Sequence, residues 1–134
     1  VLYDVLTNFA VSGKPYKPLN YDLKEHGPVT MRQALQGSLN IPAVQTFYLV
    51  GQEQGIEFAK RLGYTTLNDG DFGLSLVLGG GEVKLMDHVS AYATFANNGV
   101  RHAPISILKV ETSGGDILFE AKRGKGEKII ILRS

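Results

Sequence analysis

The stretch that decides the fold runs from Thr30 to Gly51 and reads TMRQALQGSLNIPAVQTFYLVG. Its pattern predicts two short helices that meet at a tight polar corner. Thr30 is a favoured N-cap for the first helix, and Gln33 three residues later completes a capping box. Gly37 is predicted to end this helix, because glycine adopts the left-handed conformation without steric cost.

The second helix is predicted to begin at the corner itself. Asn40 is a favoured N-cap residue, and Pro42 lies in the first turn, where its missing N–H has no partner to lose. Ser38 and Asn40 therefore fall on the turn between two buried helices, where a hydroxyl and a carboxamide face the same solvent-filled space. Ser-x-Asn alone fixes only two positions, so an ordinary turn residue beside a helix cap is the alternative interpretation.

Five longer phrases extend this pattern along the chain. They are Lys17–Asp22 (KPLNYD), Gly27–Leu35 (GPVTMRQAL), Ser38–Val44 (SLNIPAV), Leu78–Val83 (LGGGEV) and Ala91–Gly99 (AYATFANNG). In this order they resemble the transpeptidase domain of the penicillin-binding proteins, particularly the bifunctional class A enzymes. The resemblance runs from the first residue to about Ala121 and is too long for a chance match.

The resemblance implies an α/β fold of the β-lactamase/transpeptidase type, of which this segment is mainly the helical subdomain plus a β-hairpin. The family carries three catalytic motifs, Ser-x-x-Lys, Ser-x-Asn and Lys-Thr-Gly. The second occurs here as Ser38-Leu39-Asn40, and Lys-Thr-Gly does not occur. Ser12-Gly13-Lys14 is one residue too short for the first motif, and the Ser-x-x-Lys spacing of Ser106–Lys109 comes after Ser-x-Asn, out of the family order. The family order places the nucleophile before Val1, so we expect an interior segment that lacks its nucleophile and is inactive alone.

The resemblance also implies the chemistry of the parent domain. A nucleophilic serine attacks the peptide bond after a D-alanine of the peptidoglycan stem peptide, an amine then takes the acyl group, and β-lactams trap the acyl-enzyme. Ser38 is expected to relay a proton, since a hydroxyl both donates and accepts. Asn40 is expected to bind an amide of the substrate. The alternative is a non-catalytic module that keeps the fold and binds a peptide or protein.

The composition of the chain also limits the classes of molecule that it is expected to bind. A net charge of +1 argues against nucleic acid, and no apolar run is long enough to cross a bilayer, so we expect no direct membrane contact. Cysteine is absent and His26, His88 and His102 stand far apart, so neither a metal nor a cofactor is expected. The resemblance places the parent at the extracytoplasmic (periplasmic) face of the bacterial inner membrane, anchored elsewhere and joined to a glycosyltransferase domain.

We predict four parts, an extended arm (1–27), a helical core (28–101), a β-hairpin (102–121) and a basic, mobile tail (122–134). Within the core, an amphipathic helix is predicted to end at Gly63, and a central buried helix to end at Asn97–Gly99. If partner elements of the parent are missing, certain apolar side chains should be uncovered. These are Leu35, Val44, Phe47 and Leu78, with strand edges at Ile105 and Ile129.

Overall fold

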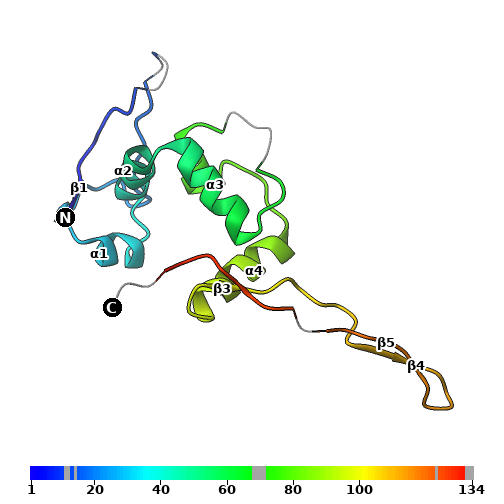
Figure 1. Cartoon of the computed structure of the whole chain (residues 1–134). Coiled ribbons are helices and arrows are strands. Elements are labelled where there is room, and N and C mark those ends of the chain that lie inside the picture. The colour runs from blue at the N-terminus through cyan, green and yellow to red at the C-terminus, as the bar shows by residue number, and fades with distance from the viewer. Residues whose placement is uncertain (11–12, 14, 68–71, 123, 132–134) are drawn as a thin grey trace. The chain divides into compact units, whose positions relative to one another are not determined.

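The computed structural model describes residues 1–10, 13, 15–67, 72–122 and 124–131. The chain divides into two compact units (Figure 1). Unit 1 comprises residues 1–58 and 66–82, and unit 2 comprises residues 59–65 and 83–134. Helix α3 (Gln52–Leu62) contributes residues to both units and agrees with the amphipathic helix predicted to end at Gly63.

Unit 1 joins a small sheet to short helices. Strands β1 and β2 pair antiparallel, with Leu2 opposite Val29 and Asp4 opposite Gly27. The elements of this unit besides α3 are β1 (Leu2–Asp4), β2 (Gly27–Val29), α1 (Met31–Gln36), α2 (Asn40–Val50) and the 3₁₀ helix η1 (Leu74–Leu78). Because β2 leads directly into α1, the pairing of β2 with β1 brings the N-terminal arm close to the predicted corner.

The core of unit 1 forms around Val44, which is fully buried. Phe9 from the N-terminal arm and Leu74 from η1 pack with it, and Phe47 adds a partly buried ring. The prediction that Val44 would be uncovered is therefore wrong, because η1 and the arm cover this side of α2. Leu35, in contrast, is 85% exposed, as predicted.

Helix α1 begins and ends as predicted, with Thr30 as N-cap and Gly37 as C-cap, but the residue in the left-handed conformation differs from the prediction. The capping box is confirmed, since the Thr30 hydroxyl accepts from the Gln33 amide while the Gln33 side chain accepts from the Thr30 amide. Gly37, however, has a φ of −79°, and the left-handed residue is Ser38, with a φ of 51°. The Gly37 amide still bonds to the Gln33 carbonyl, so the chain reverses one residue later than predicted.

Unit 2 contains α4 and two antiparallel strand pairs. The elements are α4 (Leu85–Ala96), β3 (Val100–Arg101), β4 (Lys109–Glu111), β5 (Ile117–Glu120) and β6 (Glu127–Lys128). Strands β4 and β5 form the predicted hairpin, and its turn is closed by the bond from the Thr112 amide to the Asp116 carbonyl. Strand β6 pairs with β3.

The structure differs from the predicted mobile tail at Glu127–Ile129. Ile129 is only 4% exposed and packs with Leu62 and Ala91, so the prediction of a strand edge uncovered at Ile129 is wrong. The amides of Ile129 and Ile130 both donate to the Gly99 carbonyl, and Arg61 donates to the Ile129 carbonyl. These bonds hold the segment against the end of α4. Residues 123 and 132–134 of the predicted tail lie outside the described residues.

Helix α4 ends at Ala96 with Asn97 as its C-cap, as predicted, but the prediction that it is a buried central helix is wrong. Only Ala91 and Thr94 are buried. Its large apolar residues are exposed, namely Leu85, Met86, Val89, Tyr92 and Phe95. Helical periodicity identifies an apolar face but does not supply the element that covers it.

Candidate active site

Ser38 and Asn40 lie together at the corner and line one open groove with a volume of about 720 Å³. The rest of the lining is mostly apolar and comes from β1, α1, α2, α3 and η1. Ser38 is exposed, whereas Leu39 and Asn40 are half-buried. A hydroxyl and a carboxamide are therefore presented at the rim of an apolar groove, an arrangement typical of sites that bind small molecules or peptides.

Ser38 occupies a strained backbone conformation. Its φ of 51° lies in the left-handed region, which costs a non-glycine residue about 1–2 kcal/mol. The Ser38 amide donates to the Leu35 carbonyl at 3.2 Å, and the following Leu39 amide donates to the Ala34 carbonyl at 3.0 Å. These two bonds close the corner and hold Ser38 in place. Strain of this kind concentrates at functional sites.

Asn40 is not the N-cap of α2, so that prediction is wrong. The N-cap position falls on Leu39, which makes no side-chain capping bond. The Asn40 carboxamide instead donates from Nδ2 to the Leu19 carbonyl at 2.8 Å. An amide nitrogen carries two hydrogens, so this bond leaves the second hydrogen of Nδ2 for a ligand.

The cap of α2 comes from Asn20, a residue that the sequence analysis did not single out. Its Oδ1 accepts from the backbone amides of Asn40 at 2.9 Å and Ile41 at 3.3 Å. Helix N-terminal amides need such partners, and Asn is among the residues best suited to supply them. The one signal in the sequence was the position of Asn20 within the Lys17–Asp22 phrase that carries the family resemblance.

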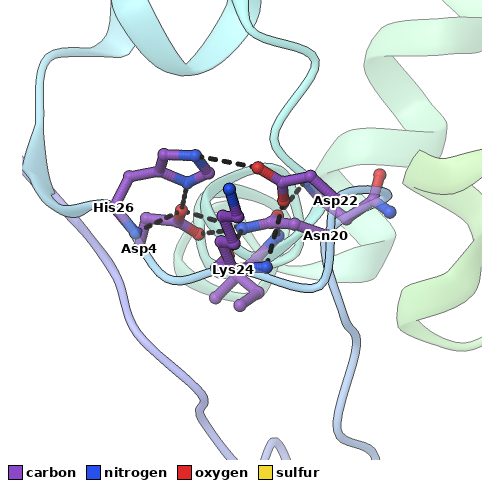
Figure 2. Close-up of polar contacts among 7 residues, drawn as sticks. Asp4, Asn20, Asp22, Lys24 and His26 are labelled. Carbon is purple, nitrogen blue, oxygen red and sulfur yellow. Dashed lines mark hydrogen bonds and ion pairs between the residues drawn. The ribbon is translucent and has the colours of Figure 1, made fainter.

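Asn20 is itself held by a buried carboxylate, Asp4. The Asn20 Nδ2 lies 2.8 Å from both carboxylate oxygens of Asp4, and it also donates to the Lys24 carbonyl at 2.8 Å (Figure 2). Asp4 is fully buried and Asn20 is 3% exposed. Removing a carboxylate from water is costly unless hydrogen-bond donors replace the lost solvent, and Asn20 is one of those donors.

His26 supplies the other donors to Asp4. Its backbone amide donates to Asp4 Oδ2 at 3.0 Å, and its Nδ1 lies 2.5 Å from the same oxygen. On the other side of the ring, Nε2 lies 3.1 Å from a carboxylate oxygen of Asp22, as Figure 2 shows. A protonated imidazole donates from both nitrogens and can therefore bridge the two carboxylates.

The ionisation of this cluster follows from these contacts. The hydrogen bond to Asp4 raises the pKa of His26 above its ordinary value of 6.5; the charge of Asp22 adds to this effect and desolvation opposes it. The pKa of Asp22 is lowered, chiefly because its carboxylate accepts from the Lys24 amide. The cluster therefore favours a positively charged ring between negatively charged partners.

Neither a metal centre nor a membrane span is found among the residues that the structure describes. No group of three or more His, Cys, Asp or Glu residues is placed there to hold a metal ion. None of the described helices combines the length and the apolar character needed to cross a membrane.

Comparison with known proteins identifies the class to which this fold and corner belong. The family model for the penicillin-binding protein transpeptidase domain matches residues 7–129. The chain belongs to this family. Its structure matches the crystal structure of penicillin-binding protein 1A from Haemophilus influenzae with a TM-score of 0.81 and 27% identity, over 93% of this chain and 19% of that one. The predicted transpeptidase-type fold is thereby confirmed.

Two relatives show how much of a longer protein this chain matches. It is 39% identical to penicillin-binding protein 1A of Aquifex aeolicus over 108 residues, which are 81% of this chain and 14% of the relative. It is 34% identical to penicillin-binding protein 1F of Bacillus subtilis over 129 residues, which are 95% of this chain and 18% of the relative. The chain thus spans less than a fifth of either protein.

Proposed function

We propose that this chain is part of a serine-type D-Ala-D-Ala transpeptidase of the class A kind. The parent protein would cross-link peptidoglycan stem peptides and bind penicillin covalently. The observation that carries this proposal is the placement of Ser38 and Asn40 at one strained corner above an apolar groove, in a chain of this family. We place the nucleophile outside these 134 residues, because their one Ser-x-x-Lys sequence, Ser106–Lys109, follows the Ser-x-Asn motif, whereas the nucleophile of the family precedes it.

In the proposed reaction a serine from outside these residues attacks the carbonyl carbon of the first D-alanine in the D-Ala-D-Ala unit. A bond forms between the serine oxygen and that carbon, and the bond to the leaving nitrogen breaks. The serine proton passes to a base, for which the family lysine is the candidate, and the Ser38 hydroxyl relays a proton to the leaving nitrogen. A hydroxyl suits this step because it accepts one proton while it gives up another.

Asn40 has the role of binding the substrate. Its Nδ2 keeps a hydrogen that is not used by the bond to Leu19, so it can donate to a carbonyl of the substrate backbone. Its position at the beginning of α2 places this donor beside Ser38. The two side chains would then act on the same amide, one by orienting it and the other by moving a proton.

The proposal also covers the location and the other domains of the parent protein. It would act at the extracytoplasmic face of the bacterial inner membrane, where its stem-peptide substrate lies, and would carry its anchor and a glycosyltransferase domain in other parts of the chain. The supporting observation is membership in a family whose matched relatives are much longer penicillin-binding proteins. The 134 residues alone would be inactive.

Labelling with a fluorescent penicillin, followed by a denaturing gel, tests the proposal on the full-length parent. We expect a labelled band for the wild type and much slower labelling for Ser38→Ala and Asn40→Ala. Ser113→Ala, an exposed serine in the hairpin of unit 2, is the matched control and should label normally. A folded parent that is not labelled would contradict the proposal and favour a non-catalytic peptide-binding module.

A further inference from the structure

We propose that Asn20 is a positioning residue for the Ser38-x-Asn40 motif, and that Asp4 and His26 orient Asn20 for this task. The inference deepens the proposed function and rests on it. Two adjacent residues of the arm hold Asn40 at two points, since Asn20 Oδ1 accepts from its backbone amide at 2.9 Å and the Leu19 carbonyl accepts from its side chain at 2.8 Å. One segment therefore fixes both the backbone and the side-chain direction of Asn40.

This arrangement differs from an ordinary helix cap. A helix that begins at Ser-Leu-Asn could be capped locally by the asparagine, as the sequence predicted. A cap of that kind would turn the Asn40 carboxamide back onto its own helix. Because Asn20 performs the capping from 20 positions away, the Asn40 carboxamide stays at the groove with a hydrogen available to a ligand.

The orientation of Asn20 depends on Asp4. A carboxamide has an oxygen end and a nitrogen end of nearly the same shape, so contacts must decide which end faces α2. The ionised carboxylate of Asp4 only accepts hydrogen bonds, and it lies 2.8 Å from the Asn20 nitrogen through both of its oxygens. The nitrogen must therefore face Asp4 and the oxygen must face the amides of Asn40 and Ile41. The reversed amide would place N–H groups against N–H groups.

His26 in turn fixes Asp4. Its backbone amide donates a hydrogen bond to Asp4 Oδ2, and its ring Nδ1 contacts the same oxygen. Its ring Nε2 contacts the carboxylate of Asp22. The order of contacts is thus His26, Asp4, Asn20 and then the first turn of α2. Catalytic groups lose much of their effect when they are displaced by about 1 Å. The buried contacts of His26, Asp4 and Asn20 should therefore influence the rate of acylation, because they fix the position of Asn40.

The test exchanges the partners of the central hydrogen bond in the full-length parent. Asn20→Asp keeps an acceptor for α2 but sets two carboxyl groups against each other. Adding Asp4→Asn to this variant restores a donor opposite an acceptor. Asn8→Ala, an exposed asparagine of the same arm, is the matched control. Should Asn20→Asp fail to fold, Asn20→Ser, which keeps a shorter acceptor, takes its place.

The readout is the first-order acylation rate constant per active site, taken from fluorescent-penicillin progress curves over a range of concentrations. The final labelled fraction counts the folded active sites separately. We expect Asn20→Asp to lower the rate constant by about tenfold or more, and the double variant to recover most of that loss, because positioning acts on the chemical step. An unchanged rate constant with a smaller labelled fraction would overturn the inference, since it would show a purely structural role.

Amide hydrogen exchange separates this inference from the proposed function. In the wild type, the amides of Asn40 and Ile41 should be protected although they belong to the first turn of a helix, and Asn20→Asp or Asn20→Ser should change that protection. Unprotected amides in the wild type would overturn the positioning inference even if penicillin labels the protein. Protected amides in a folded parent that is never labelled would overturn the proposed function instead.

Discussion

The side-chain oxygen of Asn20 lies 2.9 Å from the backbone nitrogen of Asn40 and accepts its hydrogen bond. Together with the bond from Asn40 Nδ2 to the Leu19 carbonyl, this contact joins the N-terminal arm to the corner that carries the Ser-x-Asn motif. Through Asp4, which is fully buried, it also links the corner to a histidine whose pKa is raised. Part of the support of the corner therefore lies in the arm, outside the two helices that form it.

Replacing Asn20 should destabilise unit 1 more than replacing Asn40 does. Asn20→Ala removes one of the donors to the buried Asp4 and leaves two helix amides without a cap, which should cost about 2–3 kcal/mol. Asn40→Ala removes one half-exposed bond to the Leu19 carbonyl and should cost less than about 1 kcal/mol. Urea unfolding of the 134-residue chain measures both values. Equal losses would contradict the assignment of the cap to Asn20.

The stability of unit 1 should depend on the protonation of His26. Its folded pKa is raised above the ordinary value of 6.5, mainly by the hydrogen bond to Asp4. The stabilisation is therefore complete below the unfolded pKa and is lost as the pH rises through the folded pKa. The charged groups that face the ring are Asp4 and Asp22, with Lys24 nearby on the same turn.

An NMR titration of the His26 ring measures this pKa directly. We expect a value above 6.5 in the wild type and a lower value in Asp4→Asn, where the raising contact is weakened. His26→Asn should remove this part of the pH dependence of unfolding. A wild-type pKa at or below 6.5 would show that the contact with Asp4 does not stabilise the charged ring.

Two substitutions at Ser38 should separate strain from chemistry. Ser38→Ala keeps a Cβ atom in the left-handed conformation, whereas Ser38→Gly removes that cost of about 1 kcal/mol. Both variants lose the hydroxyl and should lose penicillin acylation in the full-length parent. We expect Ser38→Gly to unfold at a higher urea concentration than Ser38→Ala. The reverse order would indicate that the backbone at Ser38 is not strained.

The exposed apolar face of α4 should make the 134-residue chain associate with itself. Leu85 is 78% exposed and Met86 64%, and contiguous apolar surface of this kind marks an interaction or aggregation site. Sedimentation at micromolar concentrations should show association that decreases in the double variant Leu85→Lys, Met86→Lys. A sharp monomer at every concentration would mean that the face is covered or too small to associate.

The local features of unit 1 could be predicted from the sequence because neighbouring residues encode them. The capping box joins Thr30 to Gln33, three positions away, so both partners stand in one short phrase. The end of α2 at Gly51 is encoded in the same way. The family resemblance likewise rests on short phrases, and the match over residues 7–129 confirms it. The roles of Ser38 and Asn40 were taken from that resemblance and stay predictions.

Contacts between distant segments could not be predicted in this way. Asn20 and Asn40 are each good N-cap residues by type, and the local sequence favoured the nearer one; only the folded arm shows that Asn20 caps α2. Asp4 and His26 are 22 positions apart, and the pairing of β1 with β2 brings them together. The sequence predicts an uncovered strand edge at Ile129, whereas in the fold Ile129 bonds to Gly99 and packs against Leu62.

There is a physical reason why local features could be predicted from the sequence and contacts between distant segments could not. Helix starts and stops depend on hydrogen bonds within one or two turns, so the sequence by itself determined where most helices of this protein lie. Which buried groups satisfy one another depends on chain segments brought together by burial of apolar side chains, and many residues of the right type compete for each contact. The tertiary structure alone decided that Asn20, oriented by Asp4, rather than Asn40, caps the beginning of α2, because the fold brings the buried acceptor Asp4 and the buried donor Asn20 together there.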